Sequence, residues 1–118
     1  MDRLEQMLED QWAIQANTFG YQFDRLTPAE RVTYIKEMVL AATHELHEAL
    51  DETTWKSWQS TGVAVFPERY MDELVDAQLM LFNLFLATGM NPNEVADLLV
   101  ERVAIKQKLN VQRQESGY

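Results

Sequence analysis

The sequence predicts one all-α domain over residues 1–118, with four helices packed as a bundle. Apolar residues make up 47% of the chain, and they recur every three or four positions, which is the spacing of one helix face. No segment alternates apolar and polar residues as a half-buried strand does. A chain of 118 residues is long enough to bury a core without disulfide or metal staples.

The first helix is expected over residues ~2–17. Leu4, Leu8 and Trp12 recur at helical spacing, and Gly20 marks the exit from the helix. After a loop, Thr27-Pro28-Ala29-Glu30 predicts the start of the next helix. In this motif the threonine can cap the helix, the proline suits the first turn, and the glutamate closes a capping box.

The second helix is expected over residues ~28–54 and carries the clearest apolar stripe in the sequence. Glu45, Glu48 and Glu52 fall together on a flank of this stripe, because each residue turns the helix by about 100°. Carboxylates beside a core stripe are expected to be partly buried. The stripe expected to be buried contains Val32, Ile35, Val39, Ala42, Leu46, Ala49 and Leu50.

A loop is expected over residues ~56–66, with Trp55, Trp58 and Phe66 anchoring it to the core. The third helix is expected over residues ~67–88, and the fourth over residues ~92–112. The fourth begins at Asn91-Pro92-Asn93-Glu94, which repeats the order of cap, proline and glutamate. The buried face of the third helix is expected to contain Leu74, Ala77, Leu81, Leu84 and Phe85.

The formal net charge of −9 makes most of the surface repel nucleic-acid backbone and anionic membranes, so neither is an expected partner. The absence of cysteine excludes a disulfide framework, a zinc–thiolate site and a cysteine nucleophile, and it fits a reducing cytoplasm. The acidic start of the chain does not read as a signal peptide. The longest apolar stretch, Leu79 to Ala87, is too short to span a bilayer.

Two acidic motifs, Glu45-x-x-Glu48 and Glu73-x-x-Asp76, are the main candidates for a functional site. Residues three apart lie on one side of a helix, so two facing pairs would crowd four carboxylates together. Oxygen ligands of this kind favour Mg²⁺, for which Mn²⁺ could substitute. Asn83, two turns after Asp76 on the same face, could add a neutral ligand or a hydrogen bond. A magnesium site in a small helical protein points to phosphate chemistry.

A solvated helix face and a di-iron centre are the alternatives to a magnesium site at these carboxylates. A solvated face is the commonest origin of any single pair, because surface helices are rich in glutamate. Two carboxylate pairs that both lie beside apolar stripes favour a metal site over a solvated face. A di-iron centre needs Glu-x-x-His on two helices, but the residues three before His44 and His47 are Ala41 and His44. Oxygen-only ligation therefore favours Mg²⁺ over iron or zinc.

Lys106, Asn110 and Arg113 recur at helical spacing near the end of the fourth helix, with Arg102 one turn earlier. Such donors can bind the phosphate charge that a metal ion leaves unneutralised. The alternative is a solvated helix end, whose cations suit the negative end of the helix dipole. At the level of the sequence both interpretations stay open.

Together these residues resemble the all-α nucleoside triphosphate pyrophosphohydrolases, which include the MazG-like proteins and the dimeric-type dUTPases. Their shared signature is Glu-x-x-Glu followed by Glu-x-x-Asp, here Glu45-Leu46-His47-Glu48 and Glu73-Leu74-Val75-Asp76. Two further segments resemble the dUTPase branch in particular. They are Trp55-Lys56-Ser57-Trp58 and the ending Lys106-x-x-x-Asn110-x-x-Arg113-Gln114-x-x-Gly117-Tyr118. The resemblance extends from about Gln11 to the last residue.

This resemblance implies Mg²⁺-dependent hydrolysis of a deoxynucleoside triphosphate to the monophosphate and pyrophosphate, with dUTP favoured. Positioning and electrostatics then carry most of the catalysis, and Glu45 or Glu48 would orient or deprotonate the attacking water. The implied metal ligands are Glu45, Glu48, Glu73 and Asp76. The implied substrate-binding residues are Gln11 and Asn83 near the base and sugar, Lys106, Asn110 and Arg113 at the phosphates, and Trp55 and Lys56. Family members are dimers or tetramers, so a homodimer or homotetramer is expected.

Three positions depart from the dUTPase pattern. Leu79 stands where a histidine is common, Trp12 where a polar residue is often found, and Gln107 where the family tends to have asparagine. These changes spare the metal site but leave base recognition open, so a purine or modified dNTP such as dGTP or dATP is the alternative substrate. A non-catalytic helical interaction module is a more distant alternative, which the acidic surface and amphipathic helices would also suit.

Overall fold

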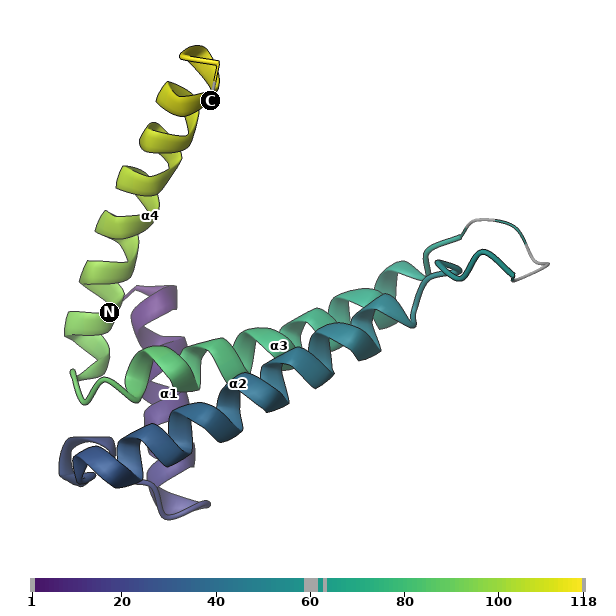
Figure 1. The fold of residues 1–118 in the computed structure, drawn as a ribbon. Coiled ribbons are helices and arrows are strands. Elements are labelled where there is room, and N and C mark those ends of the chain that lie inside the picture. Colours follow the sequence, from purple (N-terminus) through teal and green to yellow (C-terminus); the bar gives the residue numbers. More distant parts are fainter. Residues whose placement is uncertain (1, 59–61, 63, 118) are drawn as a thin grey trace.

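The computed structural model describes residues 2–58, 62 and 64–117, and in these residues the expected all-helical class is confirmed (Figure 1). The helices are α1 (Arg3–Asn17), α2 (Pro28–Leu50), α3 (Pro67–Leu86) and α4 (Pro92–Glu115), with a short 3₁₀ turn, η1 (Phe23–Arg25). The described residues form no strand, only an isolated antiparallel bridge between Thr53 and Val65. Within these ranges, none of the helices has both the length and the apolar content needed to cross a membrane.

The helix starts follow the capping signals of the sequence. At α2 the backbone N–H of Glu30 donates to the Thr27 hydroxyl over 3.2 Å, and the Thr27 N–H donates to the Glu30 carboxylate over 3.0 Å. This reciprocal capping box lowers the pKa of Glu30, chiefly through the backbone hydrogen bond from Thr27. At α4 the N–H of Glu94 donates to the Asn91 side chain over 2.9 Å. Both predicted caps are confirmed.

The second helix ends at Leu50 rather than near residue 54, because the chain after it bonds to the returning loop. The N–H of Thr54 donates to the Ala64 carbonyl over 2.9 Å, and the N–H of Phe66 donates to the Glu52 carbonyl over 3.1 Å. After a turn at residues 51–52, these bonds hold the chain from Thr53 onward against the returning loop instead of in another helical turn. The two ends of the loop therefore lie side by side where the loop joins the α2–α3 hairpin.

The helices form an extended shape rather than a compact bundle within one chain (Figure 1). Helices α2 and α3 make a long antiparallel hairpin, α1 runs across one end of it, and the C-terminal half of α4 projects away from it. The radius of gyration is 17.5 Å, whereas a compact domain of this length has about 13.5 Å. The four helices thus do not lie side by side along their full lengths.

The core lies at the end of the hairpin where α1 crosses it. Phe23 from η1 packs edge-to-face on Tyr34, with ring centroids 5.1 Å apart, and the buried Tyr34 hydroxyl donates to Gln15 over 2.8 Å. Arg31 fastens this end by donating to the carbonyls of Phe23, Leu26 and Ala87. The buried core residues are Leu8, Phe23, Tyr34, Phe82, Leu86, Ala87, Val95 and Ala96.

The predicted burial of the whole α2 stripe is wrong. Ala42 and Ala49 are buried, at 6% and 2% exposure, but Val32, Val39 and Leu46 are 56%, 47% and 51% exposed. Leu50 is also exposed, as are Leu81 and Phe85 of the predicted α3 stripe. The physical reason is that α2 packs on α3 along one line only, and no other described element of the same chain covers the adjacent line.

Candidate metal centre

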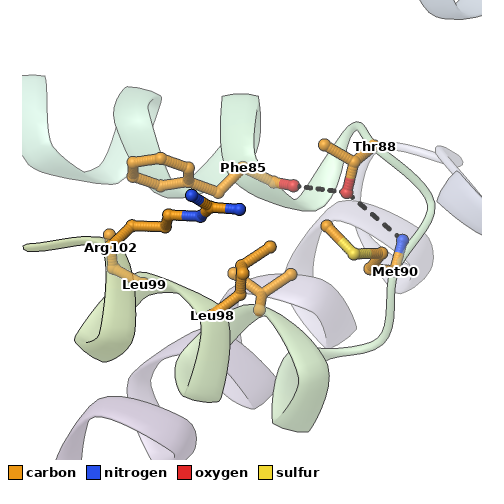
Figure 2. A pocket seen from close by; sticks show the side chains of 7 residues that line it. Phe85, Thr88, Met90, Leu98, Leu99 and Arg102 are labelled. Carbon is orange, nitrogen blue, oxygen red and sulfur yellow. Dashed lines mark hydrogen bonds between the residues drawn. The ribbon is translucent and has the colours of Figure 1, made fainter. Parts of the chain in front are cut away.

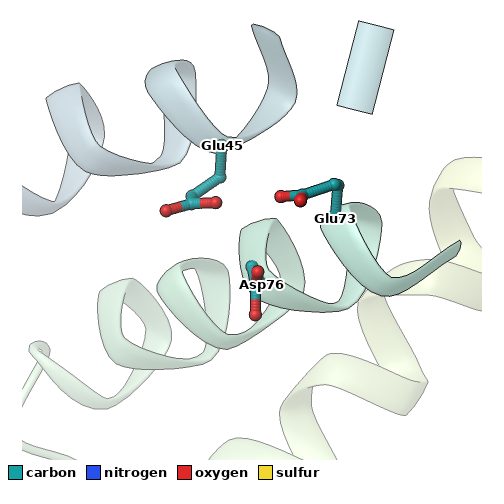
Figure 3. Close-up of side chains that lie close together, drawn as sticks. All are labelled: Glu45, Glu73 and Asp76. Atoms are coloured by element: carbon teal, nitrogen blue, oxygen red, sulfur yellow. The ribbon is translucent and has the colours of Figure 1, made fainter. Parts of the chain in front are cut away.

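Three of the four predicted ligand carboxylates come together between α2 and α3. One carboxylate oxygen from each of Glu45, Glu73 and Asp76 lies within 4.8 Å of the other two. Glu45 comes from α2, whereas Glu73 and Asp76 stand one turn apart on α3 (Figure 3). Figure 3 shows the carboxylate of Glu73 directed toward Glu45, whose side chain extends from α2 into the same gap between the helices. The two motifs, distant in sequence, therefore form one cluster.

Small side chains allow the two helices to approach each other beside this cluster. Ala49 follows Glu45 by four residues, and Ala77 follows Glu73 by four residues. Each alanine is 2% exposed. Because residues four apart share a helix face, the same faces that carry the carboxylates also carry the alanines. The cluster thus lies beside the contact between the two helices, with Glu45 and Glu73 half-buried and Asp76 exposed.

Two carboxylate oxygens of this cluster have no hydrogen-bond partner within the protein to offset their burial. Oε2 of Glu45 and Oε2 of Glu73 are buried, and neither has a hydrogen-bond partner. Burial raises the pKa of Glu45, and the charge of Glu48 raises it further. Burial also raises the pKa of Glu73, followed by hydrogen bonding and charge from Glu48. Buried carboxylate oxygens without partners are costly, so the cluster favours any species that supplies positive charge or protons.

The donor set fits a hard divalent cation. Glu45, Glu73 and Asp76 offer only oxygen ligands, which suit Mg²⁺, Mn²⁺ or Ca²⁺ better than zinc or copper. A cation between them would compensate the two buried oxygens that lack partners. Among the described residues, neither a histidine nor a cysteine belongs to this group of close ligand atoms. Exposed acidic groups also gather without a metal, so the buried oxygens are the more informative part of the cluster.

Glu48, the fourth predicted ligand, lies beside the cluster but outside its group of mutually close oxygens. Its Oε1 is 2.7 Å from Nε2 of His44, one turn earlier on α2. Sequence reasoning rejected His44 as an iron ligand, regarded it as a surface or core residue, and missed this contact. The i, i+4 spacing of the histidine and the glutamate was the available signal. Glu52, predicted on the same helix flank, lies in the turn after α2 and instead pairs with Arg69 of α3 at 3.0 Å.

The predicted substrate residues Gln11 and Asn83 meet in the interior. The Gln11 amide nitrogen donates to the Asn83 amide oxygen over 2.8 Å, which ties α1 to α3. Gln11 is 7% exposed and Asn83 is 1% exposed. The Asn83 amide nitrogen also contacts the sulfur of Met38 at 3.6 Å. In this arrangement the pair acts first as a buried polar link between helices.

The loop tryptophans do not anchor the loop to the core, so that expectation is wrong. Trp55 is 44% exposed, Trp58 is 75% exposed, and Phe66 is 42% exposed. Trp55 instead donates its indole N–H to Asp51 over 3.2 Å. The Lys56 ammonium lies 5.9 Å from the ring centres of both tryptophans. These residues sit at the far tip of the hairpin, away from the core that was expected to hold them.

The cationic stripe of α4 is not brought to the carboxylates within one chain. Lys106, Asn110 and Arg113 are exposed, and they lie on the C-terminal half of α4, which diverges from the α2–α3 hairpin (Figure 1). The carboxylate cluster sits between α2 and α3. The two predicted halves of a nucleotide site are therefore separated in a single chain.

A small, half-open apolar pocket exists, but it is not at the carboxylates. Figure 2 shows it between the end of α3 and the start of α4, with Phe85, Leu98 and Leu99 in its wall and Arg102 beside it. Its volume is about 180 Å³, below the roughly 300–1,000 Å³ of typical small-molecule sites. We regard the carboxylate cluster as the candidate centre, because it holds the uncompensated polar atoms.

No protein-family model, no curated protein and no solved structure matches this chain. The interpretation of the site therefore rests on its own residues: a carboxylate triad between two helices, buried oxygens without partners, and a neighbouring histidine–glutamate pair.

Proposed function

We propose that this protein is a divalent-cation-dependent hydrolase that converts a deoxynucleoside triphosphate and water to the monophosphate and pyrophosphate, with dUTP favoured. The all-α pyrophosphohydrolase fold is part of this proposal. The observation that supports it best is the convergence of Glu45, Glu73 and Asp76, with two buried carboxylate oxygens that have no partner. The resemblance of the motifs is what suggests the reaction, and the carboxylate cluster is the candidate site that supports the proposal.

The residues of the cluster would divide the work according to their positions. Glu45, Glu73 and Asp76 would hold Mg²⁺, which would supply the positive charge that offsets the charge of the phosphates. Glu48 stands next to this triad without belonging to it, so it is the better placed of the two candidate bases to take a proton from the attacking water. His44, whose Nε2 lies 2.7 Å from Oε1 of Glu48, would fix the orientation of that carboxyl.

Recognition of the base and the phosphates needs more than the contacts within one chain. Gln11 and Asn83 bond to each other, so a nucleotide base would reach them only when that bond opens. Leu79 and Trp12 pack against the core cluster, which favours a packing role for both departures from the dUTPase pattern. Lys106 and its neighbours on α4 would reach a phosphate at the cluster only from a second chain or after a movement of α4.

A panel of deoxynucleoside triphosphates tests this function. Purified protein is incubated with each dNTP and with Mg²⁺ or Mn²⁺, and released pyrophosphate is measured. Release from dUTP well above that from the other dNTPs is the expected result. A strong preference for dGTP or dATP would replace dUTP by a purine substrate. No pyrophosphate from any dNTP across a range of metal concentrations would overturn the proposed reaction.

A matched pair of variants ties the activity to the cluster. Asp76→Asn removes one charge from the triad, whereas Asp72→Asn makes the same change at an exposed position one turn earlier on α3. We expect Asp76→Asn to lower kcat/KM by at least about 100-fold, and Asp72→Asn to stay within about twofold of the wild type. Equal activity of both variants would favour the non-catalytic interaction module, which also predicts no thermal shift with Mg²⁺ and nucleotide.

A further inference from the structure

The apolar pocket between the end of α3 and the start of α4 is separate from the carboxylate cluster (Figure 2). Its volume is about 180 Å³, and its wall is almost wholly apolar. An apolar cavity of roughly 150 Å³ is large enough to hold one benzene ring. The pocket therefore has room for a single ring or a short branched chain, but it is too small for a nucleotide.

Part of the pocket wall belongs to the core, so packing fixes its shape. Val95 is 3% exposed and is a member of the core cluster, against which Met90 also packs. Leu98 and Leu99 are half-buried on the next turn of α4, and Phe85 contributes its ring from α3. Because the wall comes from two helices and the turn that joins them, a ligand in the pocket would contact both helices.

The turn between the two helices uses its own polar groups. The Thr88 hydroxyl donates to the Phe85 carbonyl over 2.8 Å and accepts a hydrogen bond from the Met90 N–H over 3.3 Å (Figure 2). Among the described residues of the wall, Thr88 and Arg102 are the two with a hydroxyl or charged side chain. Since the Thr88 hydroxyl already makes two hydrogen bonds, Arg102 is the group left to bind a polar part of a ligand.

Arg102 supplies a positive charge that the rest of the protein does not neutralise. Figure 2 shows its side chain extending from α4 toward Phe85 of α3. The wall is almost wholly apolar, so the methylene stem of this exposed arginine lines it and the guanidinium lies at the rim. Within the part of the chain that the structure describes, Arg102 has no ion-pair or hydrogen-bond partner.

The neighbours of Arg102 on its own helix face do not screen this charge. The residues three and four positions away are Leu98, Leu99, Ile105 and Lys106, and none of them is acidic. The guanidinium is therefore open to an anion, although the chain as a whole carries a net charge of −9.

The apolar wall and the guanidinium together select one class of ligand. An apolar body in the pocket is stabilised by leaving water. A carboxylate at the rim can accept two parallel N–H hydrogen bonds from a guanidinium. A cationic ligand would be repelled, and a neutral apolar ligand would leave Arg102 without a partner.

We propose that this pocket is a binding site for a small apolar carboxylic acid, with its ring or branched chain against Leu98 and Leu99 and its carboxylate on Arg102. Spacing alone groups Arg102 with the α4 stripe of Lys106, whereas the pocket gives it a separate role. This inference does not depend on the proposed reaction, because the pocket and the carboxylate cluster share no residue.

Phenylacetate is a suitable probe, because it carries one ring and one carboxylate. Phenylacetamide keeps the shape without the charge, and acetate keeps the charge without the ring. In an NMR titration of the backbone amides we expect phenylacetate to bind with a Kd on the order of 0.1–1 mM, and the other two at least about 10-fold more weakly. Equal binding of phenylacetamide would overturn the role of Arg102, and equal binding of acetate would overturn the role of the pocket.

Two substitutions on α4 separate the pocket from general electrostatics. Arg102→Gln and Lys108→Gln remove the same charge, but Lys108 is an exposed residue outside the pocket wall. We expect Arg102→Gln to weaken phenylacetate binding at least about 10-fold, to the level of phenylacetamide, and Lys108→Gln to leave it within about twofold of the wild type. Equal weakening by both substitutions would overturn the inference.

The same titration of the wild type locates the ligand without any substitution. We expect the largest shifts at the amides of Thr88, Leu98 and Leu99, and none at Glu45 in the carboxylate cluster. Largest shifts elsewhere would overturn the inference. Binding that appears only after dilution to monomers would also overturn it, since a side chain of a second copy would then be the occupant. A protein that binds phenylacetate but hydrolyses no dNTP would overturn the proposed function alone.

Discussion

The buried amide pair of Gln11 and Asn83 gives a sharp test of how the interior is held together. The Asn83→Leu substitution keeps a similar volume but removes the acceptor of the 2.8 Å hydrogen bond from Gln11. Gln11 is 7% exposed, so water cannot readily replace the lost partner. An unsatisfied buried donor costs about 1–3 kcal/mol. We expect Asn83→Leu to destabilise the protein by about 2 kcal/mol, and Gln11→Leu by a similar amount, because it leaves the Asn83 oxygen unpaired.

The double variant is expected to be more stable than the sum of the single changes. When both partners are apolar, no buried group is left unsatisfied, so the combined cost should fall below about 1 kcal/mol. For a chain of 118 residues, about 1 kcal/mol corresponds to roughly 4 °C in Tm. Each single variant should therefore lose about 8 °C in thermal melts at one fixed chain concentration, and the double variant less than about 4 °C.

Additive losses in the double variant would refute this reasoning, because they would mean that the two amides act independently. The same variants separate structure from function. If Gln11 and Asn83 contact the nucleotide, the double variant should recover stability without recovering kcat/KM for dUTP. If both parameters recover together, the pair is only a structural link between α1 and α3.

Further predictions concern the cluster, the cap of α2 and the arginine at the core. Because burial raises the pKa of Glu45 and Glu73 above 4.5 in the fold, the metal-free protein should lose stability as pH rises from 4.5 through those raised values. Mg²⁺ should remove that loss of stability. The measurement is Tm as a function of pH, once with Mg²⁺ and once with a chelator. A Tm profile that is the same in both conditions would contradict this prediction. Thr27→Ala should cost about 1 kcal/mol in urea unfolding, because it removes the cap of α2. Arg31→Met should cost about 2–4 kcal/mol, because it removes the donors to three carbonyls; Lys36→Met, an exposed change on the same helix, should cost less than about 0.5 kcal/mol.

The sequence alone was sufficient for the features that depend on neighbouring residues. Helix starts at Pro28 and Pro92 follow from capping residues that lie within four positions of each other. The spacing of Glu45 and Glu48, and of Glu73 and Asp76, places each pair on one side of its helix, however the helices pack. These properties are local, so periodicity and side-chain chemistry predict them.

Only the tertiary structure decided what lies against each helix. Periodicity places Val39 and Leu46 on the apolar stripe of α2. Their burial depends on whether another element packs against that stripe. None of the described elements of the same chain covers these two residues. The separation of Lys106 from the carboxylates depends on the direction in which α4 leaves the core, and the turn before α4 sets that direction. The proximity of Glu45 to Glu73 and Asp76 depends on the packing of two helices against each other, where the small, buried Ala49 and Ala77 lie. A sequence gives the faces of its helices, whereas long-range packing determines which faces meet.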